Sequence, residues 1–123
     1  MTMRFRVLGL GSAKDGTAHW WAQRVSAAAL IPLTLWFVVS LLSLPALDYI
    51  TVRAWLSVPL SSLLAVLLVA VTAYHSYLGT GVVVEDYVHS AGTKLLSLLL
   101  LRFLYVIVGG AGIFAILRVA FGS

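Results

Sequence analysis

Three runs of apolar residues, each long enough to cross a lipid bilayer, take up most of this chain. They extend over approximately 25–47, 58–84 and 95–121. A helix rises 1.5 Å per residue, so about 20 apolar residues span a hydrocarbon core about 30 Å thick. Only about ten residues separate consecutive runs, which leaves no room for a soluble domain. The sequence therefore predicts an all-α integral membrane protein with three transmembrane helices in an up-down-up arrangement.

The composition supports this class and excludes others. The 123 residues are 62% hydrophobic and 10% charged, and the mean hydropathy of +1.07 is too high for the surface of a soluble domain. The formal net charge is +4, but the basic residues lie at the ends of apolar runs and form no basic patch interleaved with aromatics, so nucleic acid is not an expected partner. The chain has no cysteine, which excludes disulfides and iron–sulfur ligation within it.

The distribution of basic residues predicts the orientation. Most of them precede the first run or lie in the second connection: Arg4, Arg6, Lys14, Arg24 and Lys94. The first connection contains only Arg53. Because positively charged segments stay in the cytoplasm, the N-terminus and the second connection are expected on the cytoplasmic side. We expect residues 1–22 to form a flexible cytoplasmic tail and residues 23–123 a three-helix anchor domain.

One histidine lies inside the second apolar run. An intramembrane His75 is costly without a partner, so it marks a functional site by default. Asp86 and Tyr87 follow where the same run meets water; eleven helical residues bring Asp86 to within about 20° of the His75 face, about 16 Å along the axis. Gly79 lies between them and leaves space for a flat macrocycle or a closely packed helix. A neutral imidazole at this depth is a suitable axial ligand for haem iron.

Each of these residues also has a structural interpretation. His75 could hydrogen-bond a neighbouring helix, and Asp86 with Tyr87 could be a solvated helix end with an interfacial anchor. Arg24 could be a positive-inside anchor.

Other polar residues carry a weaker functional signal. His19 and His89 are expected to be solvated near the membrane interface, and Lys94 is at most a minor addition to a ligand site. Arg102 lies about two turns inside the third run, where it is expected to snorkel or to pair with a neighbour rather than to bind substrate. The glycine-rich segment 109–112 is expected to permit close helix packing.

The residues around His75 match a known pattern. The run 75–87, with a Gly four residues after the His and an Asp-Tyr pair eleven and twelve residues after it, resembles the signature of the small cytochrome b anchor subunit of succinate dehydrogenase, respiratory complex II. The segment 19–27, which contains Arg24, resembles the arginine-bearing first helix of that family. The third helix carries no diagnostic motif and matches by position only.

The resemblance implies roles for individual residues. His75 would be one axial ligand of haem b, with the second ligand supplied by the larger cytochrome b anchor subunit. Arg24 would neutralise a haem propionate, and Gly79 would pack against the haem. Tyr87 would donate a hydrogen bond to a ubiquinone carbonyl, and Asp86 would orient Tyr87 or help to supply protons.

The resemblance also implies an assembly. The chain would anchor an iron–sulfur subunit and a flavoprotein subunit at the cytoplasmic face of a bacterial inner membrane, with the mitochondrial inner membrane as the alternative location. The complex would be a succinate:ubiquinone oxidoreductase, and the chain alone would not be an enzyme. Two alternatives remain open: a fumarate reductase anchor, and a non-redox helical membrane subunit such as a transporter subunit or assembly factor.

Overall fold

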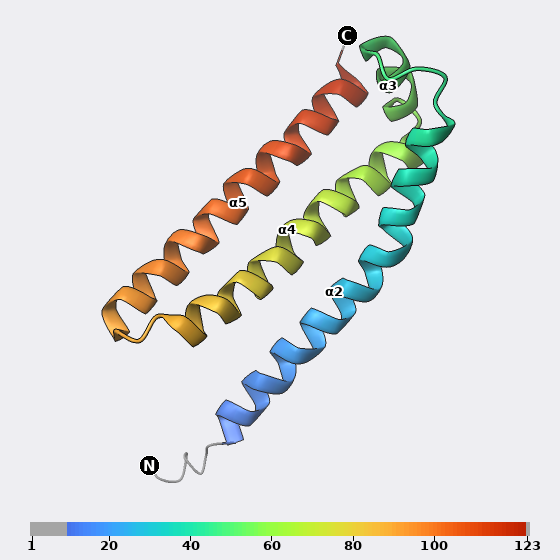
Figure 1. The fold of residues 1–123 in the computed structure, drawn as a ribbon. Coiled ribbons are helices and arrows are strands. Elements are labelled where there is room, and N and C mark those ends of the chain that lie inside the picture. Colours follow the sequence, from blue (N-terminus) through green and yellow to red (C-terminus); the bar gives the residue numbers. More distant parts are fainter. Residues whose placement is uncertain (1–9, 123) are drawn as a thin grey trace.

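The computed structural model describes the backbone of residues 10–122 and the side chains of residues 16–122 (Figure 1). This part of the chain forms four helices and no strand: α2 (Leu10–Ser43), α3 (Tyr49–Leu56), α4 (Pro59–Tyr87) and α5 (Ala91–Phe121). Three segments are long and apolar enough to cross a membrane, namely Gly16–Ser43, Pro59–Tyr87 and Ala91–Phe121. The prediction of an all-α protein with three membrane-length helices is therefore confirmed. The side of the membrane on which the N-terminus lies stays a prediction.

The helices extend beyond the apolar runs from which they were predicted. Helix α2 begins at Leu10, inside the segment expected to be a flexible tail, and only residues 88–90 separate α4 from α5. Polar residues continue a helix once it is established, so hydropathy marks the part of a helix that lies in lipid rather than its ends. Arg4 and Arg6 lie outside the described residues, and the division at residue 22 stays a prediction.

Helix α3 was not expected from the sequence. Its residues Ile50, Thr51 and Val52 are β-branched and weak helix formers, but the Asp48 carboxylate caps the helix by accepting the Thr51 N–H at 2.8 Å. The Thr51 side chain and then its backbone N–H stabilise the carboxylate and so hold the pKa of Asp48 below its usual value of 3.8. Because this pKa is lower in the folded protein, the cap stabilises α3 at neutral pH and is lost only as acid protonates the carboxyl. In the sequence, the available signal for α3 was Asp48, because Asp is a preferred N-cap residue directly before a helix.

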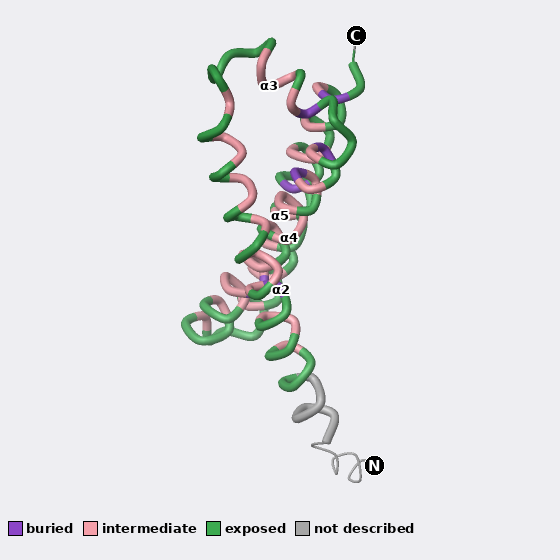
Figure 2. Tube along the Cα trace, turned by 90° about the vertical axis from the view of Figure 1, so that its right-hand side faces the viewer, coloured by how far each residue is buried: buried purple, intermediate pink, exposed green. Residues whose placement is uncertain are grey.

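Helix α4 is the central element of the fold. Helices α2 and α5 lie on opposite sides of it, and consecutive long helices run in opposite directions (Figure 1). Few side chains are buried, as Figure 2 shows, and most of the buried positions lie towards the α3 end. There Leu56, Ala65 and Ala120 form a cluster covered by Trp36, which stacks on Trp55 with ring centroids 5.6 Å apart. The remaining apolar surface is available to lipid or to other chains.

Glycines set the close approach of α4 and α5. A Cβ at Gly109 would lie 3.2 Å from the Cβ of Ala73, and one at Gly112 would lie 3.1 Å from Val69 Cγ1. A Cβ at Gly110 would meet no atom within 4 Å. The expectation that the segment 109–112 permits close packing is confirmed for the two glycines that face α4.

Gly112→Leu is therefore expected to destabilise the packing of α5 on α4, whereas Gly110→Leu is not. A side chain at 112 would force Val69 and the helix backbone apart, and overpacking of this kind costs about 1–3 kcal/mol. Both substitutions gain the same helix propensity, so the control removes that effect. The measurement is the thermal melting midpoint of the detergent-solubilised protein, and equal midpoints for the two variants would contradict the assigned contact.

Candidate functional site

His75 lies close to the centre of the fold. It is two residues, or about 3 Å, past Ala73, the midpoint of α4, and it is half-buried. Its Nδ1 is 2.8 Å from Oγ of Ser26 on α2, so the hydrogen bond to a neighbouring helix that the structural interpretation of His75 predicts is present. In the described part of the chain, the second ring nitrogen, Nε2, has no polar partner. The imidazole is thus held at one nitrogen and available at the other.

Ser26 is the residue that the sequence analysis missed at this site. It is only 5% exposed, and its Oγ also donates a hydrogen bond to the backbone oxygen of Gln23 at 3.0 Å. A serine in an apolar helix is not unusual, and its partner is 49 residues away in sequence. Only the packing of α2 on α4 in the structure shows that Ser26 and His75 are in contact.

An apolar groove lies between α2 and α4, and Ser26, but not His75, lines it. Its volume is about 550 Å³, and its walls are aliphatic or aromatic apart from the Ser26 hydroxyl and the tip of Tyr74. The groove is lined by Trp21, Ala22, Val25, Ser26, Ala29, Ala70, Val71 and Tyr74. The three alanines keep it wide, and its chemistry fits a flat, largely apolar ring system.

Gly79 and Gln23 continue the contact between α4 and α2 one turn below His75. A Cβ at Gly79 would lie 3.8 Å from Gln23 Nε2, which is an ordinary van der Waals distance. The glycine is therefore not needed for α2 to approach α4, and the Gln23 side chain covers this side of Gly79. Gln23 Oε1 is buried and receives no hydrogen bond from the described residues. Such an oxygen favours a donor from outside the chain.

Along the bundle, Arg24 lies between two contacts of α2 with α4, namely Gln23 with Gly79 and Ser26 with His75. However, Arg24 is about 160° around α2 from Ser26, and its guanidinium lies 5.3 Å from the Trp20 ring centroid. The chain does not bring Arg24 to His75, so its role toward a propionate stays a prediction.

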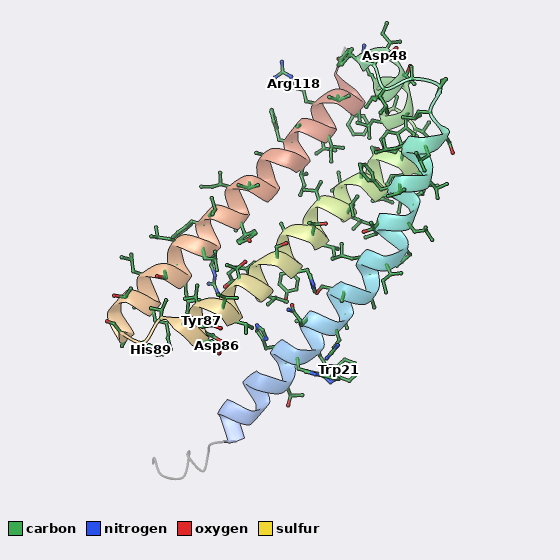
Figure 3. All side chains as sticks on the ribbon, in the orientation of Figure 1. Trp21, Asp48, Asp86, Tyr87, His89 and Arg118 are labelled. Carbon is green, nitrogen blue, oxygen red and sulfur yellow. The ribbon has the colours of Figure 1, made fainter. Side chains whose placement is uncertain are left out.

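Asp86 and Tyr87 form the exposed end of α4 (Figure 3). Tyr87 is 78% exposed, and neither side chain has a polar partner in the described part of the chain. By helical rotation Asp86 continues the side of α4 that carries His75, whereas Tyr87 points about 100° further round. The two polar groups are adjacent in sequence but face different directions.

The last turn of α4 is electrostatically unfavourable. It contains Glu85 and Asp86 and no basic residue, at the end of the helix where the backbone dipole is negative. Both carboxylates are exposed to solvent.

Arg102 pairs with a neighbour, as expected. Its Nε and an Nη each donate to the Tyr77 hydroxyl at 3.3 Å, and the guanidinium lies 5.9 Å from the Tyr77 ring centroid. One turn further along α4, the hydroxyls of Thr80 and Tyr105 are 3.0 Å apart. These contacts join α4 to α5 and leave Arg102 separate from the His75 pair. His89 is exposed in the connection, and Lys94 is half-buried in the first turn of α5.

These features define a three-pass helical membrane protein with a half-partnered histidine at its centre and a polar end on the same helix. Comparison with known proteins assigns the family. The model of the succinate dehydrogenase/fumarate reductase transmembrane subunit family matches residues 2–109, and the chain belongs to this family.

Similar proteins agree with this assignment. The chain is 31% identical over 123 residues to the succinate dehydrogenase hydrophobic membrane anchor subunit of Paracoccus denitrificans, covering 100% of this chain and 95% of that protein. It is 34% identical over 79 residues to the subunit of the same name from Rickettsia conorii, covering 63% of each chain. It is 28% identical over 103 residues to the succinate dehydrogenase membrane anchor subunit of Reclinomonas americana, covering 81% of this chain and 86% of the relative. No solved structure gives a significant match.

Proposed function

We propose that this chain is the hydrophobic membrane anchor subunit of a bacterial succinate:ubiquinone oxidoreductase. In that role it binds haem b jointly with the larger cytochrome b anchor subunit and contributes to the ubiquinone reduction site. The family membership and the match along the whole chain to a subunit of this kind support the proposal. The observation that carries the haem assignment is His75, bonded at Nδ1 and free at Nε2 near the middle of a membrane helix.

The residues around His75 fit a haem. His75 Nε2 would hold the haem iron, and the groove between α2 and α4, which Ser26 lines, offers apolar walls next to the Ser26–His75 pair. The other two histidines, His19 near the start of the α2 span and His89 after α4, lie away from the centre. A second axial ligand would therefore come from the larger anchor subunit. When bound, the haem would supply a one-electron carrier inside the membrane.

The end of α4 fits the chemistry of quinone reduction. Converting a quinone to a quinol takes two electrons and two protons, so the site needs both an electron donor and water. Tyr87 would donate its phenolic O–H to a quinone carbonyl oxygen and stabilise the charge that develops there. Asp86 would exchange protons with the solvent. The isoprenoid tail of the quinone would remain in lipid.

The electrons must come from other subunits. The chain has no cysteine to hold an iron–sulfur cluster, so an iron–sulfur subunit and a flavoprotein subunit would dock on the cytoplasmic face, near the basic N-terminal segment. The exposed apolar faces of the helices would contact lipid and the larger anchor subunit.

A fumarate reductase anchor is the alternative that the family description itself includes. The two differ in reaction direction and quinone type. Rates of the purified complex with ubiquinone and with a low-potential menaquinone distinguish them, and faster turnover with menaquinone in the fumarate-reducing direction would favour the alternative.

The reduced-minus-oxidised absorbance spectrum of the purified complex tests the proposal. We expect a b-type spectrum together with succinate-dependent reduction of ubiquinone. Activity without a b-type spectrum would remove the haem assignment and leave the anchor function. If the purified chain co-isolates with no flavoprotein, shows no b-type spectrum and supports no succinate-dependent reduction of ubiquinone, a non-redox membrane subunit would be favoured instead.

A further inference from the structure

Ser26 is distinguished from the other buried polar residue of the described chain. Among residues 16–122, only Ser26 and Ser62 are polar and buried, at 5% and 4% exposure. The Ser62 hydroxyl makes a local bond to the Pro59 backbone oxygen within α4. The Ser26 hydroxyl makes the equivalent local bond to Gln23, and in addition a bond across the helix interface to His75. This second bond needs an explanation that local helix geometry does not provide.

The direction of the Ser26–His75 hydrogen bond follows from the number of protons. A serine hydroxyl has one proton, and the Gln23 backbone oxygen can only accept. If Ser26 donates to Gln23, its oxygen can approach His75 Nδ1 at 2.8 Å only as an acceptor. The proton of the neutral imidazole is then on Nδ1, and the lone pair is on Nε2. The opposite direction would place the proton on Nε2 and leave no lone pair there for a metal.

We propose that Ser26 is a positioning residue that fixes His75 in the tautomer required for iron ligation. This inference rests on the proposed haem function and deepens it. The groups that accept a proton from a metal-bound histidine fix its tautomer and ring orientation and raise its basicity as a ligand. Near the middle of the bilayer few other acceptors are available, so the bond is not readily replaced by water.

The test compares Ser26→Ala with Ser26→Thr and Ser62→Ala in the purified, assembled complex. Ser26→Ala removes the acceptor with little change in volume, whereas Ser26→Thr retains a hydroxyl at the same position. Ser62→Ala removes an equally buried serine that does not contact His75. Ser26→Cys, with a weakly accepting thiol of similar shape, replaces the alanine variant if that variant does not assemble. The readouts are haem content, the haem midpoint potential and the electron paramagnetic resonance signal of the low-spin haem.

We expect Ser26→Ala to weaken haem retention by about 10–100-fold, the usual effect of losing an outer-shell partner. The midpoint potential of the remaining haem should become more positive, because a less basic imidazole stabilises the ferric state less. Ser26→Thr should restore both values, and Ser62→Ala should resemble the unmodified complex. A change that only loosened the packing would lower haem content without a consistent shift of the potential or the resonance signal.

The outcomes separate this inference from the proposed function. Unchanged haem content, potential and resonance signal in Ser26→Ala, alongside haem loss in His75→Ala, would overturn the positioning role and leave the haem ligand. Equal effects of Ser26→Ala, Ser26→Thr and Ser62→Ala would also overturn it, because they would indicate general packing. Full haem retention in His75→Ala would overturn the haem function itself, and the positioning role with it.

Discussion

His75→Ala is expected to remove haem from the assembled complex. The substitution deletes the only imidazole of this chain near the middle of a membrane helix, and His19 and His89 lie too far along the bundle to replace it. Loss of an outer-shell partner costs about 10–100-fold in metal affinity, and loss of a direct ligand costs more. Assembly should survive, because Ser26 retains its own hydrogen bond to Gln23 and the substitution leaves no further buried polar group without a partner.

Pyridine haemochrome content per purified complex measures this effect. The matched control is His89→Ala, the same chemical change at an exposed position in the connection after α4. We expect the control to retain its haem. Equal haem content in the two variants would show that His75 is only a packing residue bonded to α2.

The membrane-spanning part of the fold could be predicted because the bilayer imposes it. Backbone polar groups cannot stay unpaired in hydrocarbon, so a long apolar run must be a helix. The extent of the run then indicates which residues of that helix lie in the membrane. Regions outside the lipid follow weaker rules. Helix α3 depends on one capping carboxylate at Asp48 and on packing of Trp55 against Trp36, which hydropathy does not detect.

Only part of the candidate site could be predicted, for a related reason. A lone His75 in an apolar run is visible in sequence because burying it is costly. The role of Ser26 cannot be read from the sequence. A serine hydroxyl that bonds a backbone oxygen of its own helix is inexpensive to bury, and the second partner of Ser26 depends on how α2 packs on α4. The level of Arg24 relative to His75 along the bundle is likewise set by helix pairing.

The remainder of the site depends on contacts between chains. The free Nε2 of His75, the unpaired Gln23 Oε1 and the exposed tip of Tyr87 all lack a partner within the described chain. In the proposed assembly these groups meet the haem, the larger anchor subunit and the quinone. A single sequence specifies one side of each contact, so it can suggest roles for His75 and Tyr87, which stay predictions, but not the shape of the completed pocket.

Tyr87→Phe is expected to slow ubiquinone reduction while sparing electron transfer to an artificial acceptor. The change removes one hydroxyl and leaves the ring in place at the end of α4. A hydrogen bond to a group that develops charge contributes about 1.5–3 kcal/mol, so the rate should fall about tenfold to 100-fold. Haem content should not change, because Tyr87 lies twelve residues, or about 18 Å along α4, from His75.

Two assays on the same preparation make this prediction specific. Succinate oxidation with a water-soluble dye measures the flavoprotein and iron–sulfur subunits, and succinate–ubiquinone activity measures the membrane site. Tyr49→Phe is the matched control, because it removes another exposed phenol at the start of α3, at the opposite end of the helix bundle. Parallel loss of both activities in Tyr87→Phe would indicate a failure of assembly. Unchanged quinone activity would assign the Tyr87 hydroxyl to the membrane interface, and the proton donor would then have to come from Asp86 or from the larger anchor subunit.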